Sequence, residues 1–176
     1  MTEQMTEQIP DNEPVESLME HLGDKDGMVR KRARASLVAR GAPAVAPLSL
    51  AVCQSRQKQV RWEAAKALGE LCAVEAIPSL VLALDDSDDD VSWLAAEALE
   101  KLGQAAWPAL LNALVERGAE NLELRQGAHH ALKGQRQAGL NDALKALQQA
   151  LESNVGTDTP PAAANLLKRM RQRSRR

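Results

Sequence analysis

The segment Val60-Arg-Trp-Glu-Ala-Ala-Lys-Ala-Leu-Gly69 returns 31 residues later as Val91-Ser-Trp-Leu-Ala-Ala-Glu-Ala-Leu-Glu100. A third copy, Val29-Arg-Lys-Arg-Ala-Arg-Ala-Ser-Leu-Val38, stands 31 residues before the first, and weaker copies begin at Leu124 and Thr159. Alanine and leucine recur in the copies at helical spacing, which predicts helices that pack closely through small side chains. Repetition at this period is typical of a stacked array of helical units.

Each copy is preceded by a second apolar segment, which we expect to form the first helix of a pair. These first helices are expected at residues 15–24, 42–53, 74–85, 105–117 and 140–152, where apolar residues follow the i, i+3, i+4, i+7 pattern. Acidic residues at 85–90 suit the start of the next helix, and Gly41, Gly103 and Gly118 suit helix ends. The sequence therefore predicts five helix pairs, with atypical units at both ends.

The composition supports the same fold class. Aromatic residues make up 2% of the 176 residues, and the chain has no Phe and no Tyr. Sheet cores favour aromatic and β-branched side chains, whereas alanine and leucine favour helices. We predict an all-α solenoid.

The charge is unevenly placed. Residues 1–26 hold eight acidic residues and one basic residue, while residues 168–176 hold six basic residues and no acidic one. We predict a disordered acidic segment at 1–13, the solenoid at 14–170 and a basic tail at 171–176. The nearly neutral middle argues against nucleic acid coating the body of the array. We interpret the tail first as a solvated helix end, because cations favour a helix C-terminus. As an interaction arm it could touch RNA, an anionic lipid or the acidic N-terminal segment of another copy.

Three observations point to a cytoplasmic protein without a membrane span. The first residues are polar and acidic, unlike a secretory signal, and the longest apolar stretch, 42–53, contains two prolines and is too short to cross a bilayer. Cys53 and Cys72 fall at opposite ends of an antiparallel helix pair, so we expect no disulfide between them. We interpret both as small core residues.

The sequence shows no recognisable catalytic signature and no glycine-rich phosphate loop. His129 and His130 are adjacent on a helix, so their side chains point about 100° apart and do not grip one metal from one face. We therefore expect no enzyme activity, no metal and no cofactor.

The apolar first helix, the short acidic turn and the Val-Arg-x-x-Ala-Ala-x-Ala-Leu-Gly pattern at 60–69 resemble a HEAT repeat. Specifically, the pattern resembles the short, alanine-rich class related to repeats of the phycobilisome-lyase type. This resemblance implies a right-handed, gently curved array whose second helices line a concave groove. It also implies a ladder of Asp and Arg, which Asp24 and Arg30 match in spacing, and Arg61 and Asp86 could pair across a unit boundary.

The candidate binding residues are those that the packing leaves over on the second helices. Trp62 and Trp93 occupy equivalent positions one repeat apart and are expected to be exposed apolar anchors. Trp107 takes an apolar position of a first helix, so we expect it in the core. The predicted partner-binding residues are Trp62, Trp93, Leu94, Lys31, Arg32, Glu63, Lys66 and Glu97.

The function favoured by this pattern is a non-enzymatic scaffold or adaptor that holds a protein or peptide segment in the groove. An alternative implied by the resemblance is an accessory subunit of a bilin lyase or of a related chromophore-protein maturase. A third hypothesis is implied only by analogy with HEAT-like DNA glycosylases, which use tryptophans and a carboxylate on the concave face; Trp93 and Glu97 at i, i+4 match that arrangement. The mixed charge of the groove argues against it, because nucleic acid needs a basic surface.

Overall fold

The computed structural model describes residues 13–153 and 155–174, and within them it contains ten α-helices and no strand. The all-α prediction is confirmed. The helices are α1 (Val15–His21), α2 (Gly27–Arg40), α3 (Ala42–Gln54), α4 (Lys58–Leu71), α5 (Ile77–Ala83), α6 (Asp89–Leu102), α7 (Trp107–Arg117), α8 (Leu122–Leu132), α9 (Asn141–Glu152) and α10 (Thr159–Arg173). Short 3-10 turns at Val74–Ala76, Gly103–Ala105 and Gly156–Asp158 precede α5, α7 and α10.

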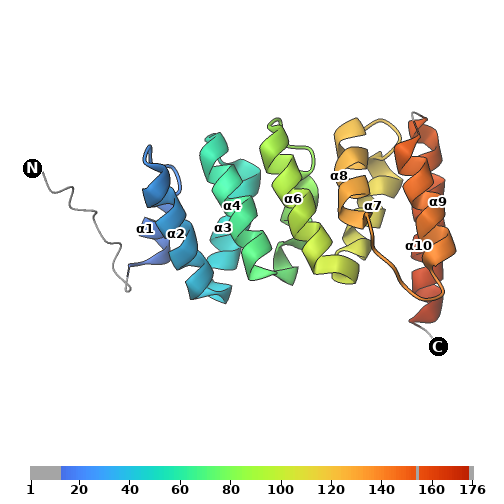
Figure 1. Cartoon of the computed structure of the whole chain (residues 1–176), viewed down its shortest axis with the longest axis horizontal. Helices are drawn as coiled ribbons and strands as arrows, with labels where there is room; N and C mark the ends of the chain where they lie inside the picture. The colour runs from blue at the N-terminus through green and yellow to red at the C-terminus, as the bar shows by residue number, and fades with distance from the viewer. Residues whose placement is uncertain (1–12, 154, 175–176) are drawn as a thin grey trace, which may run out of the picture.

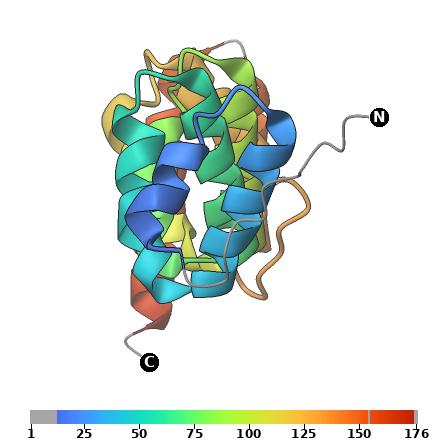
Figure 2. The same cartoon turned by 90° about the vertical axis from the view of Figure 1, so that its left-hand side faces the viewer.

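The helices stand side by side in two layers (Figures 1 and 2). In the first four pairs the second helices form one layer, in which α2 packs on α4, α4 on α6 and α6 on α8. We call this layer the front layer, because it faces the viewer in Figure 1. The first helices form the back layer, in which α1, α3, α5 and α7 pack in succession.

In the last pair the first and second helices lie in the opposite layers from those of the earlier pairs. Its first helix, α9, packs against α8 at the end of the front layer, and its second helix, α10, packs against α7 at the end of the back layer. The connection between α8 and α9 contains Gly134 and Gly139, both with φ near +70°, a left-handed conformation that glycine adopts without steric cost. The fifth pair is therefore present as expected but is placed in the opposite order.

Alanine and leucine fill the space within and between the pairs. Ala64, Ala65 and Leu68 of α4 are fully buried. Gly69 lets α6 approach closely, since a Cβ at this position would lie 3.1 Å from the Cβ of Ala98. Trp107 is only 2% exposed, which confirms its predicted place in the core.

Three of the front-layer helices begin with a side-chain cap. Asp26, Asp88 and Asn121 each accept a hydrogen bond from a backbone N–H two or three residues later, at the first turns of α2, α6 and α8. Such caps satisfy N–H groups that have no partner inside the helix. These caps therefore help to fix where α2, α6 and α8 begin, whereas α4 begins without a side-chain cap.

The arginine that follows the repeated valine or leucine has a recurring structural role. In three units its guanidinium donates to a backbone carbonyl six residues earlier, in the connection before the helix. The pairs are Arg30 with Asp24 (2.8 Å), Arg61 with Ser55 (3.0 Å) and Arg125 with Ala119 (3.2 Å). The expected pairing of the Asp24 carboxylate with Arg30 is thus replaced by a bond to the main chain.

The expected contact between Arg61 and Asp86 is confirmed. Nε and Nη2 of Arg61 lie 2.6 and 2.9 Å from the two carboxylate oxygens, which gives a bidentate pair across the boundary between the second and third units. The carboxylate raises the pKa of Arg61 through this hydrogen bond. A bidentate charged pair of this kind fixes geometry as well as adding energy.

Several further expectations can be compared with the structure. Cys53 and Cys72 are both free, but both are exposed, so their interpretation as core residues is wrong.

Glu13 belongs to the structured part, because its backbone carbonyl accepts a hydrogen bond from Arg40; residues 1–12 lie outside the described residues. Among the described helices, none is both long and apolar enough to cross a membrane.

Candidate functional site

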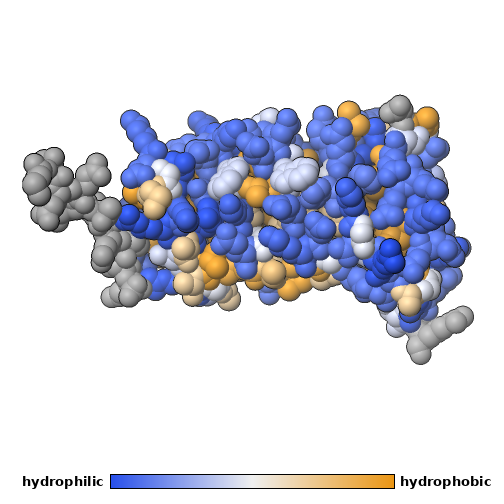
Figure 3. All heavy atoms as spheres, in the orientation of Figure 1, coloured by the Kyte–Doolittle hydropathy of each residue, from blue (hydrophilic) through white to orange (hydrophobic). Residues whose placement is uncertain are grey.

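The front layer presents a mainly hydrophilic face (Figure 3) with two hollows on it. The first, between α2 and α4, has a volume of about 630 Å³, and we call it the basic hollow. It is lined by Gly27, Arg30, Lys31, Arg34, Lys58, Gln59, Trp62, Glu63, Lys66 and Asp90. The second, between α6 and α8, has a volume of about 230 Å³, and we call it the acidic hollow. It is lined by Asp86, Asp89, Ser92, Trp93, Ala96, Glu123, Gln126, Gly127 and His130.

Trp62 lines the basic hollow but is half-buried, so it is not the exposed anchor that the sequence predicted. Its ring packs against the hydrophobic core. The Lys66 ammonium lies 4.7 Å from the ring centroid, and the Arg34 guanidinium lies 5.9 Å from it. Cations at these distances are attracted to the negative face of an indole. The Trp62 ring therefore packs between the hydrophobic core and two cationic side chains.

Glu63 is not the exposed rim residue that the helical register predicted. It is 4% exposed, and its carboxylate forms ion pairs with Arg34 and, at 3.5 Å, with Nε of Arg30. The reason is that α2 packs against this side of α4, so position 63 faces the neighbouring helix. Its charge compensates two arginines of the preceding unit.

The remaining cations of the basic hollow differ in how they are paired. Lys58 lies 2.6 Å from Asp88 and 3.6 Å from Asp90. The hydrogen bond between Lys58 and Asp88 raises the pKa of the lysine and lowers the pKa of the aspartate. Lys31 is exposed. The Nε–H groups of Arg30 and Arg34 are buried without a hydrogen-bond partner.

Trp93 is the exposed aromatic residue of the face. It is 56% exposed, and its ring centroid lies 4.1 Å from that of His130, with the two planes tilted by 50°. His130 in turn lies 3.7 Å from Glu100. The neighbouring unit thus supports the indole from one side, and more than half of its surface stays in contact with solvent.

The other predicted site residues are less prominent. Leu94 is half-buried and packs against the core. Arg32 and Glu97 are also half-buried, and neither lines the two hollows. The structure therefore brings Lys31, Trp62, Glu63 and Lys66 together in one hollow, and it places Trp93 in the other.

The back layer carries an apolar surface that the sequence interpretation missed. Leu50 of α3 and Leu82 of α5 are 55% and 56% exposed, and they line a hollow of about 650 Å³ together with Cys53. Helix α3 contains no charged residue. A helix that is apolar all round and lies at a surface leaves apolar side chains uncovered, so the composition of 42–53 contained the signal.

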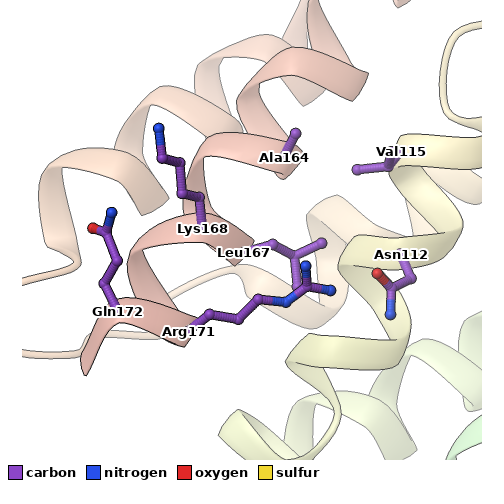
Figure 4. Close-up of a pocket in the computed structure, with 7 residues that line it drawn as sticks. All are labelled: Asn112, Val115, Ala164, Leu167, Lys168, Arg171 and Gln172. Atoms are coloured by element: carbon purple, nitrogen blue, oxygen red, sulfur yellow. The ribbon is translucent and has the colours of Figure 1, made fainter. Parts of the chain in front are cut away.

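A further hollow of about 430 Å³ lies between α7 and α10 in the back layer. Leu167 and Arg171 extend from α10 toward α7 (Figure 4). Residues 171–173 of the predicted tail continue α10, and Arg173 donates to the backbone carbonyl of Ala138 in the connection before α9. These residues are thus in contact with the body of the array.

The described residues contain no group of three or more His, Cys, Asp or Glu side chains arranged to hold a metal ion. The two hollows present charged groups and two indole rings. Groups of these kinds are common at surfaces that bind other proteins.

Comparison with known proteins agrees with the repeat pattern. A family model described as HEAT repeats matches residues 15–100 and 46–133. The solved complex of CpcE and CpcF of phycocyanin lyase from Nostoc sp. PCC7120 is similar over 98% of this chain and 70% of its own, at 26% identity and a TM-score of 0.52. An engineered protein is similar over 90% of this chain and 79% of its own, at 24% identity and a TM-score of 0.43. No curated protein sequence matches the chain.

Proposed function

Because the chain belongs to the HEAT-repeat family, we propose that it is a non-enzymatic scaffold or adaptor that binds a segment of another protein on its front face. Stacked repeats offer extended surfaces instead of one enclosed active site. The similar CpcE–CpcF structure is itself a complex of two proteins. We propose a cytoplasmic location for the protein, because free thiols such as those of Cys53 and Cys72 stay reduced there.

The observation that carries the proposal is the exposure of Trp93. A tryptophan that is 56% exposed leaves a large apolar area in contact with water. Covering this area with another molecule removes it from water and lowers the free energy. Tryptophan is enriched among the residues that dominate binding energies. Its contact with His130 holds the ring in place, which lowers the entropy lost on binding.

The test compares three variants of the purified protein as bait in native lysate. Trp93→Ala should remove a partner that the unchanged protein retains, and its urea denaturation should stay close to that of the unchanged protein. Titration of the purified partner should then show an affinity loss of about 2 kcal/mol or more. Trp62→Ala tests the half-buried ring of the basic hollow in the same way.

The back-layer surface provides the matched control. Leu50→Ser combined with Leu82→Ser removes two side chains that are as exposed as Trp93, and it should leave the partner bound. If this control loses the partner while Trp93→Ala keeps it, the binding site is on the back layer and the proposal for the front face is wrong.

The similarity to phycocyanin lyase supports a second candidate, an accessory subunit of a bilin lyase or of a related chromophore-protein maturase. The two candidates differ in one property that is simple to measure. A lyase-type subunit should acquire a visible absorption band after it is mixed with a bilin and passed through a desalting column, whereas a scaffold for protein segments should elute colourless.

A further inference from the structure

The two hollows carry opposite charge. The basic hollow is lined by five Lys or Arg residues and two acidic residues, whereas the acidic hollow is lined by three acidic residues and no Lys or Arg. Both are lined by residues of the front-layer helices, α2 and α4 for the first hollow and α6 and α8 for the second, so they lie on the same face. A molecule that covers Trp62 and Trp93 therefore contacts both the positively charged and the negatively charged hollow.

The charge of the basic hollow is not fully compensated by the protein. Glu63 supplies one carboxylate to two arginines. Lys31 and Lys66 form no ion pair with any described residue, and Lys66 instead faces the Trp62 ring. Arg34 is nine-tenths buried and also forms an ion pair with Glu70 at 3.3 Å, so the surplus positive charge rests on the two lysines. Ammonium groups without an ion-pair partner favour a carboxylate.

The acidic hollow has the opposite surplus. Asp86 is neutralised by its bidentate pair with Arg61, but Asp89 and Glu123 have no ion-pair partner within the described part of the chain. The exposed ring of Trp93 lies in the same hollow. A cation above an indole beside two carboxylates gains both a cation–π interaction and Coulomb attraction.

We infer that the front face binds an extended protein segment of ordered charge, with its acidic residues in the basic hollow and its basic residues in the acidic hollow. The inference rests on the proposed function and specifies the class of partner. Adjacent helices lie about 10 Å apart, so the hollows are separated by about 20 Å. An extended chain rises about 3.3 Å per residue, so about six residues connect the two charged groups. A nucleic acid does not fit, because its phosphates would meet Asp89 and Glu123.

The experiment uses the three tryptophans as separate reporters. The indole N–H signals of the ¹⁵N-labelled full chain are assigned with Trp→Phe variants and followed during titration. The probe is a synthetic peptide of about ten residues with glutamates at one end, lysines at the other and a leucine between them. A second peptide contains the same residues with the charges alternating. A nitroxide at the lysine end should broaden the Trp93 signal more than the Trp62 signal, and the buried Trp107 should keep its chemical shift during titration with the unlabelled peptide.

Charge reversal gives the quantitative readout. At low salt, Lys31→Glu combined with Lys66→Glu, or Asp89→Lys combined with Glu123→Lys, should each weaken the charge-ordered peptide about tenfold, and combining both sets should restore binding with the nitroxide now near Trp62. Equal affinity for the ordered and alternating peptides, or broadening of Trp62 by the nitroxide on the unchanged protein, would overturn the inference. These outcomes leave the proposed function intact, since it fails only if capture of the natural partner does not depend on Trp93.

Discussion

Replacement of the buried Glu63 by glutamine is the most demanding test of the interface between α2 and α4. The change preserves the size of the side chain but removes the charge that faces Arg30 and Arg34. The side chains of Glu63 and Arg34 are 6% and 11% exposed, so water does little to compensate the loss. Removal of one partner from a buried ion pair costs about 3–5 kcal/mol.

The structure places the expected loss at the lower end of that range. Arg30 keeps its hydrogen bonds to two backbone carbonyls, and Arg34 keeps Glu70 at 3.3 Å from its Nε. We therefore expect Glu63→Gln to lower the free energy of unfolding by about 3 kcal/mol, which for a chain of this length corresponds to a fall in Tm of about 6–12 °C. Urea denaturation followed by far-UV circular dichroism measures the change.

A second glutamate on the same helix provides the control. Glu70 also lies near Arg34, but its side chain is 38% exposed, and Glu70→Gln should change stability by about 0.5 kcal/mol or less. Glu63→Gln combined with Arg34→Met should cost less than the two single changes together, because the double variant leaves no unpaired charge from this contact. If Glu63→Gln is as mild as Glu70→Gln, the carboxylate is accessible to solvent and the argument for a buried pair is refuted.

Three further outcomes are expected. Trp107→Ala should destabilise the array by about 3–5 kcal/mol through a core cavity, as urea denaturation would show, and a loss below about 1 kcal/mol would contradict its burial. Arg61→Lys should cost about 1–2 kcal/mol in the same assay, because an ammonium does not form the bidentate pair with Asp86, and unchanged stability would count against that geometry. Lys58 lowers the pKa of Asp88 in the folded state, so this group contributes stability above its unfolded pKa near 3.8, and the contribution is lost as the pH falls through the lower folded pKa. Asp88→Asn should therefore flatten the fall of Tm below about pH 4, and an unchanged profile would show that another group is responsible.

Most of the fold could be predicted because the repeat is strong in local pattern. The expected first helix at 42–53 differs from α3 by one residue, and the expected helix at 140–152 differs from α9 by one. The position of Trp107 followed from its equivalence to apolar residues in other units. These features depend on helical periodicity and small side chains, which are properties of a segment of about ten residues.

The site was harder to predict because its burial depends on the neighbouring units. Position 63 lies beside the packed stripe of α4, and periodicity alone does not indicate that α2 covers it. The support of Trp93 by His130 likewise depends on how α8 packs on α6. The exchange of layers in the last pair depends on the path of the connection from α8 to α9, whose two glycines indicate a change of direction without indicating its sense.

The exchanged last pair also determines where the array could be made longer. After each of the first three pairs the chain leaves from a front-layer helix, and the next unit starts in the back layer. A duplicate of the unit at residues 74–103, inserted between two of these pairs, would keep that alternation and extend the front face by one helix. A duplicate attached after α10 would start from the back layer and would meet the array in the wrong order. The array can therefore be lengthened by inserting a helix pair between existing pairs, and a longer binding surface is best engineered by insertion before α9.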